Sequence, residues 1–281
     1  MQKVVKVGIV KLGCLGTVPL LEFLLDERAD REDVDVRVVG SGAKLGIDQS
    51  IEAATTLVNM KPDLVVLVGP AQQTAGPKEA RRILVESGIP TVVISDSPMK
   101  RIREELESEG VGYIVVEADP MIGARREFLD PIEMAIFNSD VIRLLACVGV
   151  FNAIIDIIDS LIEDIKRGEE PKLPRKVINK DAALEAAEFE NPYARAKALA
   201  AHEVARNVAT VNIEACFKER EWIRYTTLTA SAHEMLRYAS KLAEEAREIE
   251  KSSDMVLRRP HHKDGSRRVK RKLLEKPTKE N

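Results

Sequence analysis

Aromatic side chains and cysteines are scarce in this sequence of 281 residues, and both shortages narrow what the protein can do. Aromatic residues make up 4%, so a surface that stacks several nucleic-acid bases is not expected. The cysteines, Cys14, Cys147 and Cys216, are far apart and form no C-x-x-C pair. The sequence therefore predicts single thiols rather than a disulfide framework or a metal site.

Strong net charge and long apolar runs are missing too. The net charge of −3 gives no general nucleic-acid signature. The most apolar stretch, "VIRLLACVGVFNAII", contains Arg143 and Asn152 and falls short of a membrane span. The first ten residues run into a strand pattern without the apolar core of a signal peptide. We therefore expect a cytoplasmic protein with neither a membrane nor a nucleic acid as partner.

Motifs that can be recognised from spacing are absent as well. Gly8, Gly13 and Gly16 do not follow the G-x-G-x-x-G spacing of a dinucleotide-binding turn, and there is no P-loop. His233 begins "HEMLR", which lacks the second histidine of an H-E-x-x-H zinc site. His202, in "AAHEVA", is expected on a helix surface or at an interface. The sequence therefore contains no H-E-x-x-H zinc site.

Short runs rich in valine and isoleucine alternate with amphipathic helical stretches over the first 118 residues. The runs are "KVVKVGIV", "VDVRVVG", "PDLVVLVG", "IPTVVIS" and "VGYIVVEA". Strands this apolar, separated by helices, are typical of a parallel sheet that is covered on both faces. The sequence predicts an α/β fold with a doubly wound parallel sheet.

From Asp130 onward, apolar residues repeat at helical spacing. "DPIE" predicts a helix that starts with Asp130 as N-cap, and "NPYARAKALAA" predicts a second start at Asn191. The tail "DMVLRRPHHKDGSRRVKRKLL" predicts two strands around a Lys-Asp-Gly turn. We expect an α/β domain at 1–129, a helix bundle at 130–253 with a short strand near 174–178, and a small antiparallel β appendage with the C-terminal tail at 254–281.

The residues that follow the five predicted strands suggest a ligand cleft. They read "KLGCLG", "GSGAKLG", "GPAQQTAGP", "SDSP" and "ADPMIGARR", and most are rich in small residues or proline. The carboxyl ends of parallel strands share one edge of a sheet, where ligands bind. The second strand ends without an acidic residue for a ribose diol, and Ser41 and Lys44 stand there instead. This favours a phosphate or polar tail over NAD, and leaves NADP open.

Three long segments resemble the coenzyme F420-dependent methylenetetrahydromethanopterin dehydrogenases of methanogenic and related archaea. They are "LLDERADREDVDVRVVGSGAK", "ADPMIGARREFLDP" and "FENPYARAKALAA", and the resemblance continues into "LRRPHHKDG" and "LLEKP". It implies reversible hydride transfer between methylenetetrahydromethanopterin and the deazaflavin coenzyme F420. The products are methenyltetrahydromethanopterin and reduced F420. It further implies a homohexamer without metal or bound flavin.

The resemblance and the strand ends together give candidate site residues. The α/β domain would bind the coenzyme through residues of the strand-end loops: Lys11, Gly13, Gly16, Ser41, Gly42, Lys44, Gly69, Pro70 and Asp96. Arg125, Arg126 and Asn138, which lie between the α/β domain and the helix bundle, would bind the pterin substrate. Asp119 and then Asp130 are the candidates for a catalytic carboxylate.

Other roles compete with these. Pro131 and Glu133 complete a helix cap at Asp130, and both arginines could pair with Glu127 or its neighbours. Two other functions would use the same cleft: an NADP-dependent dehydrogenase and a ligand sensor without catalysis.

Overall fold

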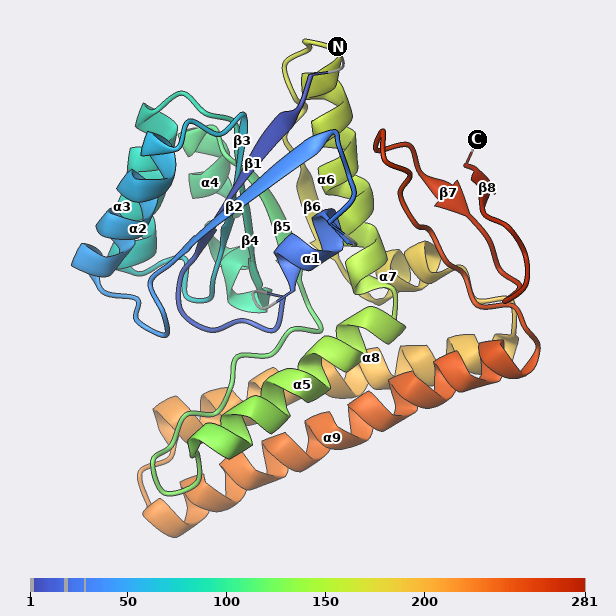
Figure 1. The fold of residues 1–281 in the computed structure, drawn as a ribbon. Coiled ribbons are helices and arrows are strands. Elements are labelled where there is room, and N and C mark those ends of the chain that lie inside the picture. Colours follow the sequence, from blue (N-terminus) through green and yellow to red (C-terminus); the bar gives the residue numbers. More distant parts are fainter. Residues whose placement is uncertain (1–2, 18–19, 28, 281) are drawn as a thin grey trace.

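A computed structural model describes residues 3–17, 20–27 and 29–280. Two predicted regions include a residue outside this described part of the chain: Arg28 in the segment "LLDERADREDVDVRVVGSGAK", and Asn281 at the end of the predicted tail. A six-stranded parallel sheet has the order β2-β1-β3-β4-β5-β6 (Figure 1). The strands are β1 (Val5–Lys11), β2 (Val34–Gly40), β3 (Leu64–Val68), β4 (Thr91–Asp96), β5 (Gly112–Val116) and β6 (Arg175–Ile178). The predicted doubly wound sheet is confirmed.

Helices cover both faces of the sheet because its strands are apolar on both sides. In β3 every residue is buried, and successive side chains enter different hydrophobic clusters. One face packs against α2 (Ile47–Asn59), α3 (Ala75–Glu86) and α4 (Arg103–Glu109) (Figure 1). The other packs against α1 (Leu21–Leu25), α6 (Val150–Lys166) and α7 (Lys180–Ala187). A 3₁₀ helix, η1 (Ser97–Ile102), follows β4 directly.

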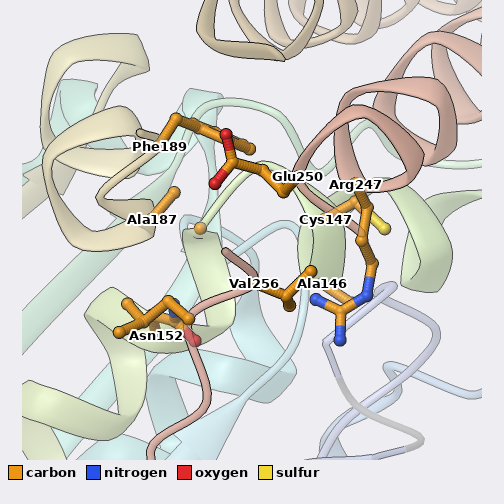
Figure 2. Close-up of a pocket in the computed structure, with 10 residues that line it drawn as sticks. Ala146, Cys147, Asn152, Ala187, Phe189, Arg247, Glu250 and Val256 are labelled. Atoms are coloured by element: carbon orange, nitrogen blue, oxygen red, sulfur yellow. The ribbon is translucent and has the colours of Figure 1, made fainter. Parts of the chain in front are cut away.

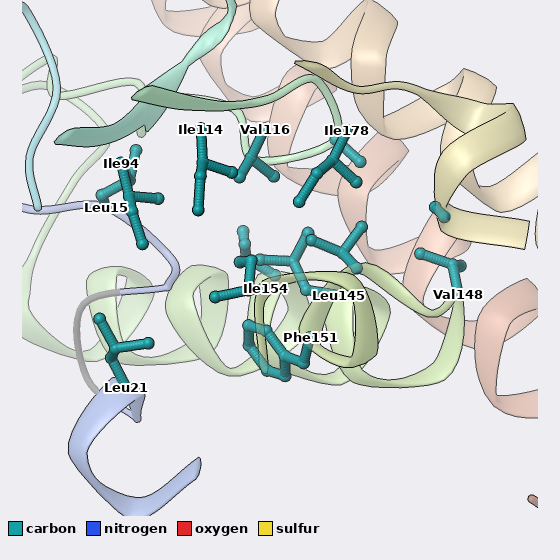
Figure 3. Packing of buried hydrophobic residues seen from close by; sticks show 14 of the residues in the cluster. Leu15, Leu21, Ile94, Ile114, Val116, Leu145, Val148, Phe151, Ile154 and Ile178 are labelled. Atoms are coloured by element: carbon teal, nitrogen blue, oxygen red, sulfur yellow. The ribbon is translucent and has the colours of Figure 1, made fainter. Parts of the chain in front are cut away.

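Helix α6 joins the sheet to the helical layer. Its apolar face is buried in the cluster under the sheet, with Phe151, Ile154, Ile158 and Ile162. Figure 3 shows Phe151 and Ile154 on the side of α6 that faces Ile114 and Val116 of the sheet. After α6 the chain returns to form β6, which pairs with β5. The short strand expected inside the helical range therefore belongs to the sheet.

The bundle consists of α5 (Pro131–Cys147), α8 (Pro192–Ile213) and α9 (Trp222–Ser252), which lie side by side below the sheet (Figure 1). Both predicted caps are present: Asp130 accepts the N–H groups of Ile132 and Glu133, and Asn191 accepts those of Tyr193 and Ala194. Buried alanines on α8 and α9 let these two helices approach closely. Helix α9 starts at Trp222, where the Glu221 side chain caps it by accepting the N–H groups of Ile223 and Arg224.

The C-terminal segment is antiparallel, as predicted, but its pairing is more limited. Bridges join Arg258 to Lys270 and His261 to Arg267 around the Lys-Asp-Gly turn. The only continuous pairing in the part of the segment that the structure describes is between β7 (Arg268–Val269) and β8 (Thr278–Lys279). Several basic side chains of this segment pair with acids; Arg259, for example, pairs with Glu188 and Glu280.

A buried ionic network attaches this segment to the rest of the molecule. Arg31 donates two hydrogen bonds of 2.9 Å to Asp33 and one of 3.2 Å to Asp159. The imidazole of His261 lies 2.7 Å from the other oxygen of Asp159. A Cβ atom on Gly265 would lie 1.9 Å from the Asp33 carboxylate, so this turn requires glycine.

Within the described residues no single helix is long and apolar enough to cross a membrane; α5 and α6 pass that test only as a pair, bent by 70°.

Candidate active site

The strand-end loops lie together at the lower edge of the sheet, facing the helical layer (Figure 1). Because β1 lies between β2 and β3, the winding of the sheet reverses between β1 and β3. Such reversals place ligand sites at the carboxyl ends of the strands.

A cleft of about 240 Å³ opens between the ends of β3, β4 and β5 and the end of α8. Its polar lining consists of Gln73, Asp96, Ser97, Arg101, Glu117 and Asp119. Its apolar lining consists of Ala71, Pro98, Met121, Ala209, Ile213 and Phe217, so an apolar wall faces a polar one. Ala71 has a φ of 55°, an uncommon value for a residue with a side chain, and such strain clusters at functional sites.

Asp119 is the most deeply buried acid of this cleft, with 1% of its surface exposed. Its Oδ1 accepts the N–H of Gly16 at 2.9 Å and its Oδ2 accepts the N–H of Thr17 at 3.0 Å. Burial raises the pKa of Asp119 to about 7; the two N–H groups oppose this rise, and the nearby Asp96 adds to it. The group is therefore poised to change charge near neutral pH.

Asp96 ends β4 in the same cleft and is 5% exposed. Its Oδ1 accepts a hydrogen bond of 3.2 Å from the Ser95 hydroxyl. Burial raises the pKa of Asp96 to about 6. Among the described residues no cation forms an ion pair with either Asp96 or Asp119. The cleft thus contains two buried carboxyl groups that no salt bridge neutralises.

Several lining residues were not expected from the sequence. Glu117 pairs with Lys100, and Arg101 is exposed at the rim. Glu117 could have been predicted as a cleft residue from the sequence, because it is the first acidic residue after an otherwise apolar strand. Phe217 could not have been predicted in this way, because it lies in η2 (Glu214–Lys218), a π-helical turn without a recognisable sequence pattern.

The loops after β1 and β2 form a second, shallower part of the strand-end edge. Gly13 and Gly42 have φ values of 66° and 65°, which favour glycine. The Ser41 hydroxyl accepts the Gly13 N–H at 3.3 Å and donates to the Lys44 carbonyl at 2.6 Å. Lys44 is exposed and forms no ion pair within the described residues, whereas Lys11 lies 2.7 Å from Glu22. Lys44 is thus the more available of the two predicted phosphate contacts.

Other predicted coenzyme residues serve packing at this edge. A Cβ atom on Gly69 would lie 2.2 Å from the Leu12 carbonyl, and one on Gly16 would lie 2.1 Å from Val141. Pro70 is buried beside Gly69. Gly16 also donates the hydrogen bond that holds Asp119. Coenzyme contacts for these residues stay predictions.

Apart from Asp119, the four residues predicted for catalysis or substrate binding lie outside the lining of the cleft. Asp130 is exposed and both its hydrogen bonds cap α5, which favours the capping role over the catalytic one. Arg125 contacts main-chain carbonyls of η2, and Arg126 is exposed. Asn138 is half-buried and accepts a 3.6 Å hydrogen bond from the Cys14 thiol. Roles of Asp130, Arg125, Arg126 and Asn138 in catalysis or substrate binding stay predictions.

The two helix-borne histidines are buried, and the surface location expected for His202 is wrong. His202 is fully buried because α8 turns this face towards the core, and neither ring nitrogen has a hydrogen-bond partner in the described part of the chain. Burial lowers the pKa of His202. His233 packs between Phe128 and Phe137 at centroid distances of 4.7 and 4.6 Å. No group of three or more potential metal ligands occurs among the described residues.

A smaller cavity of about 60 Å³ lies between the α5–α6 junction, α7 and α9 (Figure 2). Glu250 lines it and accepts the N–H groups of Asn191 at 2.7 Å and Glu190 at 3.3 Å. This carboxylate therefore holds the chain that enters α8. At this volume the cavity is far too small for a coenzyme-sized ligand, and it is not part of the strand-end edge.

Comparison with known proteins identifies the family. The family model for methylene-5,6,7,8-tetrahydromethanopterin dehydrogenase matches residues 5–278. The chain belongs to this family. Relatives named F420-dependent methylenetetrahydromethanopterin dehydrogenase are 51% identical in Methanocaldococcus jannaschii and 52% in Methanothermobacter thermautotrophicus and Archaeoglobus fulgidus. Each match covers 98% of this chain and 99% of the relative.

A solved structure of the family has the same fold. It is described as F420-dependent methylene-tetrahydromethanopterin dehydrogenase in complex with methylene-tetrahydromethanopterin and coenzyme F420. Its TM-score with this chain is 0.96 at 48% identity, over 98% of this chain and all of that one. The resemblance predicted from the three sequence segments is confirmed.

Proposed function

We propose that this dehydrogenase transfers a hydride reversibly between 5,10-methylenetetrahydromethanopterin and coenzyme F420. The products are 5,10-methenyltetrahydromethanopterin and reduced F420, in the one-carbon metabolism of archaea. The observation that carries the proposal is the near-complete match to a family structure described with both reactants. We expect the pterin ring in the cleft with Asp96 and Asp119, next to the strand-end loops where we expect the coenzyme.

The strand-end loops fit a deazaflavin coenzyme with a phosphate-bearing tail. A Cβ atom on Gly42 would meet nothing within 4 Å, so a ligand can approach the main chain there. Lys44 adjoins that opening, and its ammonium group, which forms no ion pair with any described residue, can make a charge-assisted contact to phosphate. When bound, the coenzyme supplies the hydride acceptor. Neighbouring Ser41 and Gly13 are tied to each other and keep the two loops in register.

The substrate's own chemistry reduces what the protein must supply. Loss of hydride leaves a positive charge on a carbon flanked by two nitrogens, which delocalise it. No proton is removed from that carbon, so no general base is needed there. The protein must hold the rings at contact distance, which can contribute roughly 7–11 kcal/mol. The carboxylate form of Asp119, held rigid by two N–H groups, stabilises the developing cation.

One assay separates this function from its alternatives. The purified protein is mixed with methylenetetrahydromethanopterin and F420, and the visible absorbance of the oxidised deazaflavin is followed. We expect it to disappear, with no turnover when NADP or NAD replaces F420. Turnover with NADP alone would indicate the NADP-dependent dehydrogenase, and tight binding without turnover would indicate a ligand sensor.

The assembly and its location extend the proposal. Large apolar side chains are exposed on the bundle, including Ile132, Tyr193, Trp222, Ile223 and Tyr238. Exposure of this kind marks interaction surfaces, and we propose that the bundle mediates a homohexamer in the cytoplasm. We also propose that residues 1–129 bind the coenzyme, with 130–253 and 254–281 as the bundle and the appendage.

A further inference from the structure

An exposed aromatic residue borders the cleft on the side of the helical layer. Phe217 is 70% exposed, although burial of a phenyl ring is favourable. It lies in η2, where α8 widens into a π turn and the Glu219 N–H donates to the Glu214 carbonyl at 2.9 Å. Single π turns occur frequently at functional sites. The turn brings Phe217 to the wall that faces Asp96 and Asp119.

Arg125 fixes this π turn from the linker that precedes α5. Its Nε and Nη2 donate to the Ala215 carbonyl at 2.9 and 2.7 Å, and Nη2 also donates to the Glu219 carbonyl at 3.0 Å. The guanidinium lies 4.1 Å from the centre of the Tyr225 ring. These contacts hold carbonyl groups on either side of Phe217. By holding the Ala215 and Glu219 carbonyls, Arg125 therefore fixes the position of Phe217 between them.

The linker between β5 and α5 is in turn held by residues of α8 and α9. The Asn212 side-chain amide donates to the Met121 carbonyl at 2.6 Å. A Cβ atom on Gly123 would lie 2.7 Å from Asn212 and 2.8 Å from Thr229, so the linker touches α8 and α9 directly. Met121, Ile213 and Phe217 form one continuous apolar wall of the cleft.

We propose that the π turn clamped by Arg125 presents Phe217 as an aromatic wall against the ring system of the pterin substrate. This inference rests on the proposed function. An aromatic face suits a flat heterocycle, and stacked pairs favour contact beyond simple burial. The cleft holds one ring system, since whole drug-sized ligands need roughly 300–1,000 Å³. The loop with Ser41 and Lys44 follows β2, the edge strand, whereas the cleft lies at the ends of β3, β4 and β5. If the coenzyme phosphate binds at that loop, this cleft is left for the pterin.

Steady-state kinetics of the full-length enzyme test this role. We expect Phe217→Ala to raise KM for methylenetetrahydromethanopterin about tenfold, with kcat and the KM for F420 within about threefold of wild type. Phe217→Tyr keeps the ring and should restore KM. Leu274→Ala, which removes another exposed apolar side chain outside both the cleft and the bundle, should change neither constant. An unchanged pterin KM in folded Phe217→Ala, or a rise confined to the F420 KM, would overturn the proposal.

A double-mutant cycle tests the clamp. Arg125→Ala should raise the same KM, Arg125→Lys should restore part of it, and Arg125→Ala combined with Phe217→Ala should be no worse than Phe217→Ala alone. Fully additive effects would show that Arg125 acts by another route, such as direct substrate contact. If Phe217→Ala dissociates the oligomer and leaves KM unchanged, Phe217 is an interface residue and the inference is wrong. An inactive wild-type enzyme would instead refute the proposed function.

Discussion

The backbone N–H of Gly16 donates to Oδ1 of Asp119 across 2.9 Å, although 103 positions separate the two residues in the sequence. The contact joins the loop after β1 to the end of β5, and the neighbouring Thr17 N–H binds the second oxygen. The carboxylate is thereby oriented before any ligand arrives. Such preorganisation is what allows a fixed charge to stabilise a transition state.

Replacing this carboxylate should impair turnover more than folding. We expect Asp119→Asn to lower kcat on the order of tenfold to a thousandfold, because one preorganised electrostatic contact is lost. The asparagine keeps one of the two backbone contacts, so circular dichroism should show a folded protein. Asp63→Asn is the matched control, since Asp63 accepts the Lys6 N–H at the opposite edge of the sheet. Normal turnover in Asp119→Asn would contradict the assignment.

The two buried carboxyl groups should make stability fall as pH rises. Their pKa values lie above the usual 3.8, at about 6 for Asp96 and about 7 for Asp119. The folded state holds protons that the unfolded state has released, between about pH 4 and 6 for Asp96 and between about pH 4 and 7 for Asp119. Over those ranges each group lowers the free energy of unfolding by up to about 1.4 kcal/mol per pH unit. Urea titrations at pH 4 to 8 should show a weaker decrease for Asp96→Asn combined with Asp119→Asn. An identical slope would exclude the effect.

Lys44 should contribute to coenzyme affinity. Lys44 is exposed and forms no ion pair in the part of the chain that the structure describes. Lys44→Ala should therefore weaken F420 binding by about 1–3 kcal/mol, the scale of a charge-assisted contact to phosphate. Fluorescence titration of the deazaflavin measures this directly. Lys11→Ala should have a smaller effect, since Lys11 already pairs with Glu22. Lys176→Ala, on the distant β6, is the control, and equal affinity in all three variants would relocate the phosphate site.

Removing His202 should stabilise the protein without abolishing activity. Both ring nitrogens are buried without a partner among the described residues, a situation that costs about 1–3 kcal/mol per group. His202→Leu should therefore raise the melting temperature and keep most of the turnover. His202→Gln, which retains polar atoms, should give no such gain. A folded but inactive His202→Leu enzyme would show that the imidazole takes part in catalysis.

The oligomer should depend on the exposed apolar residues of the bundle. Light scattering should give about six times the 31.2 kDa chain mass. Ile223→Asp should lower this mass, whereas Leu274→Asp, at a 96% exposed position outside the bundle, should not. A wild-type monomer at micromolar concentration would refute the hexamer.

The sheet, its strand ends and both helix caps could be predicted because each depends on residues adjacent in sequence. Val92, Val93 and Ile94 form an apolar run shortly before Asp96, and Asp130 is followed by Pro131 and, two positions later, Glu133. The role of Arg125 could not be predicted in this way, because its acceptors are 90 and 94 positions away. The burial of His202 likewise depends on how α8 packs, which helical spacing alone does not determine.

Strand β6 has a consequence for how the chain folds. Tyr113 pairs with Arg175, so the last strand can dock only after α5 and α6 have been synthesised. Closing so long a loop slows folding, because its entropy is lost before the pairing compensates for it. Until then β5 is an open strand edge, able to pair with another nascent chain. Docking of β6 on β5 therefore protects the sheet from aggregation during synthesis.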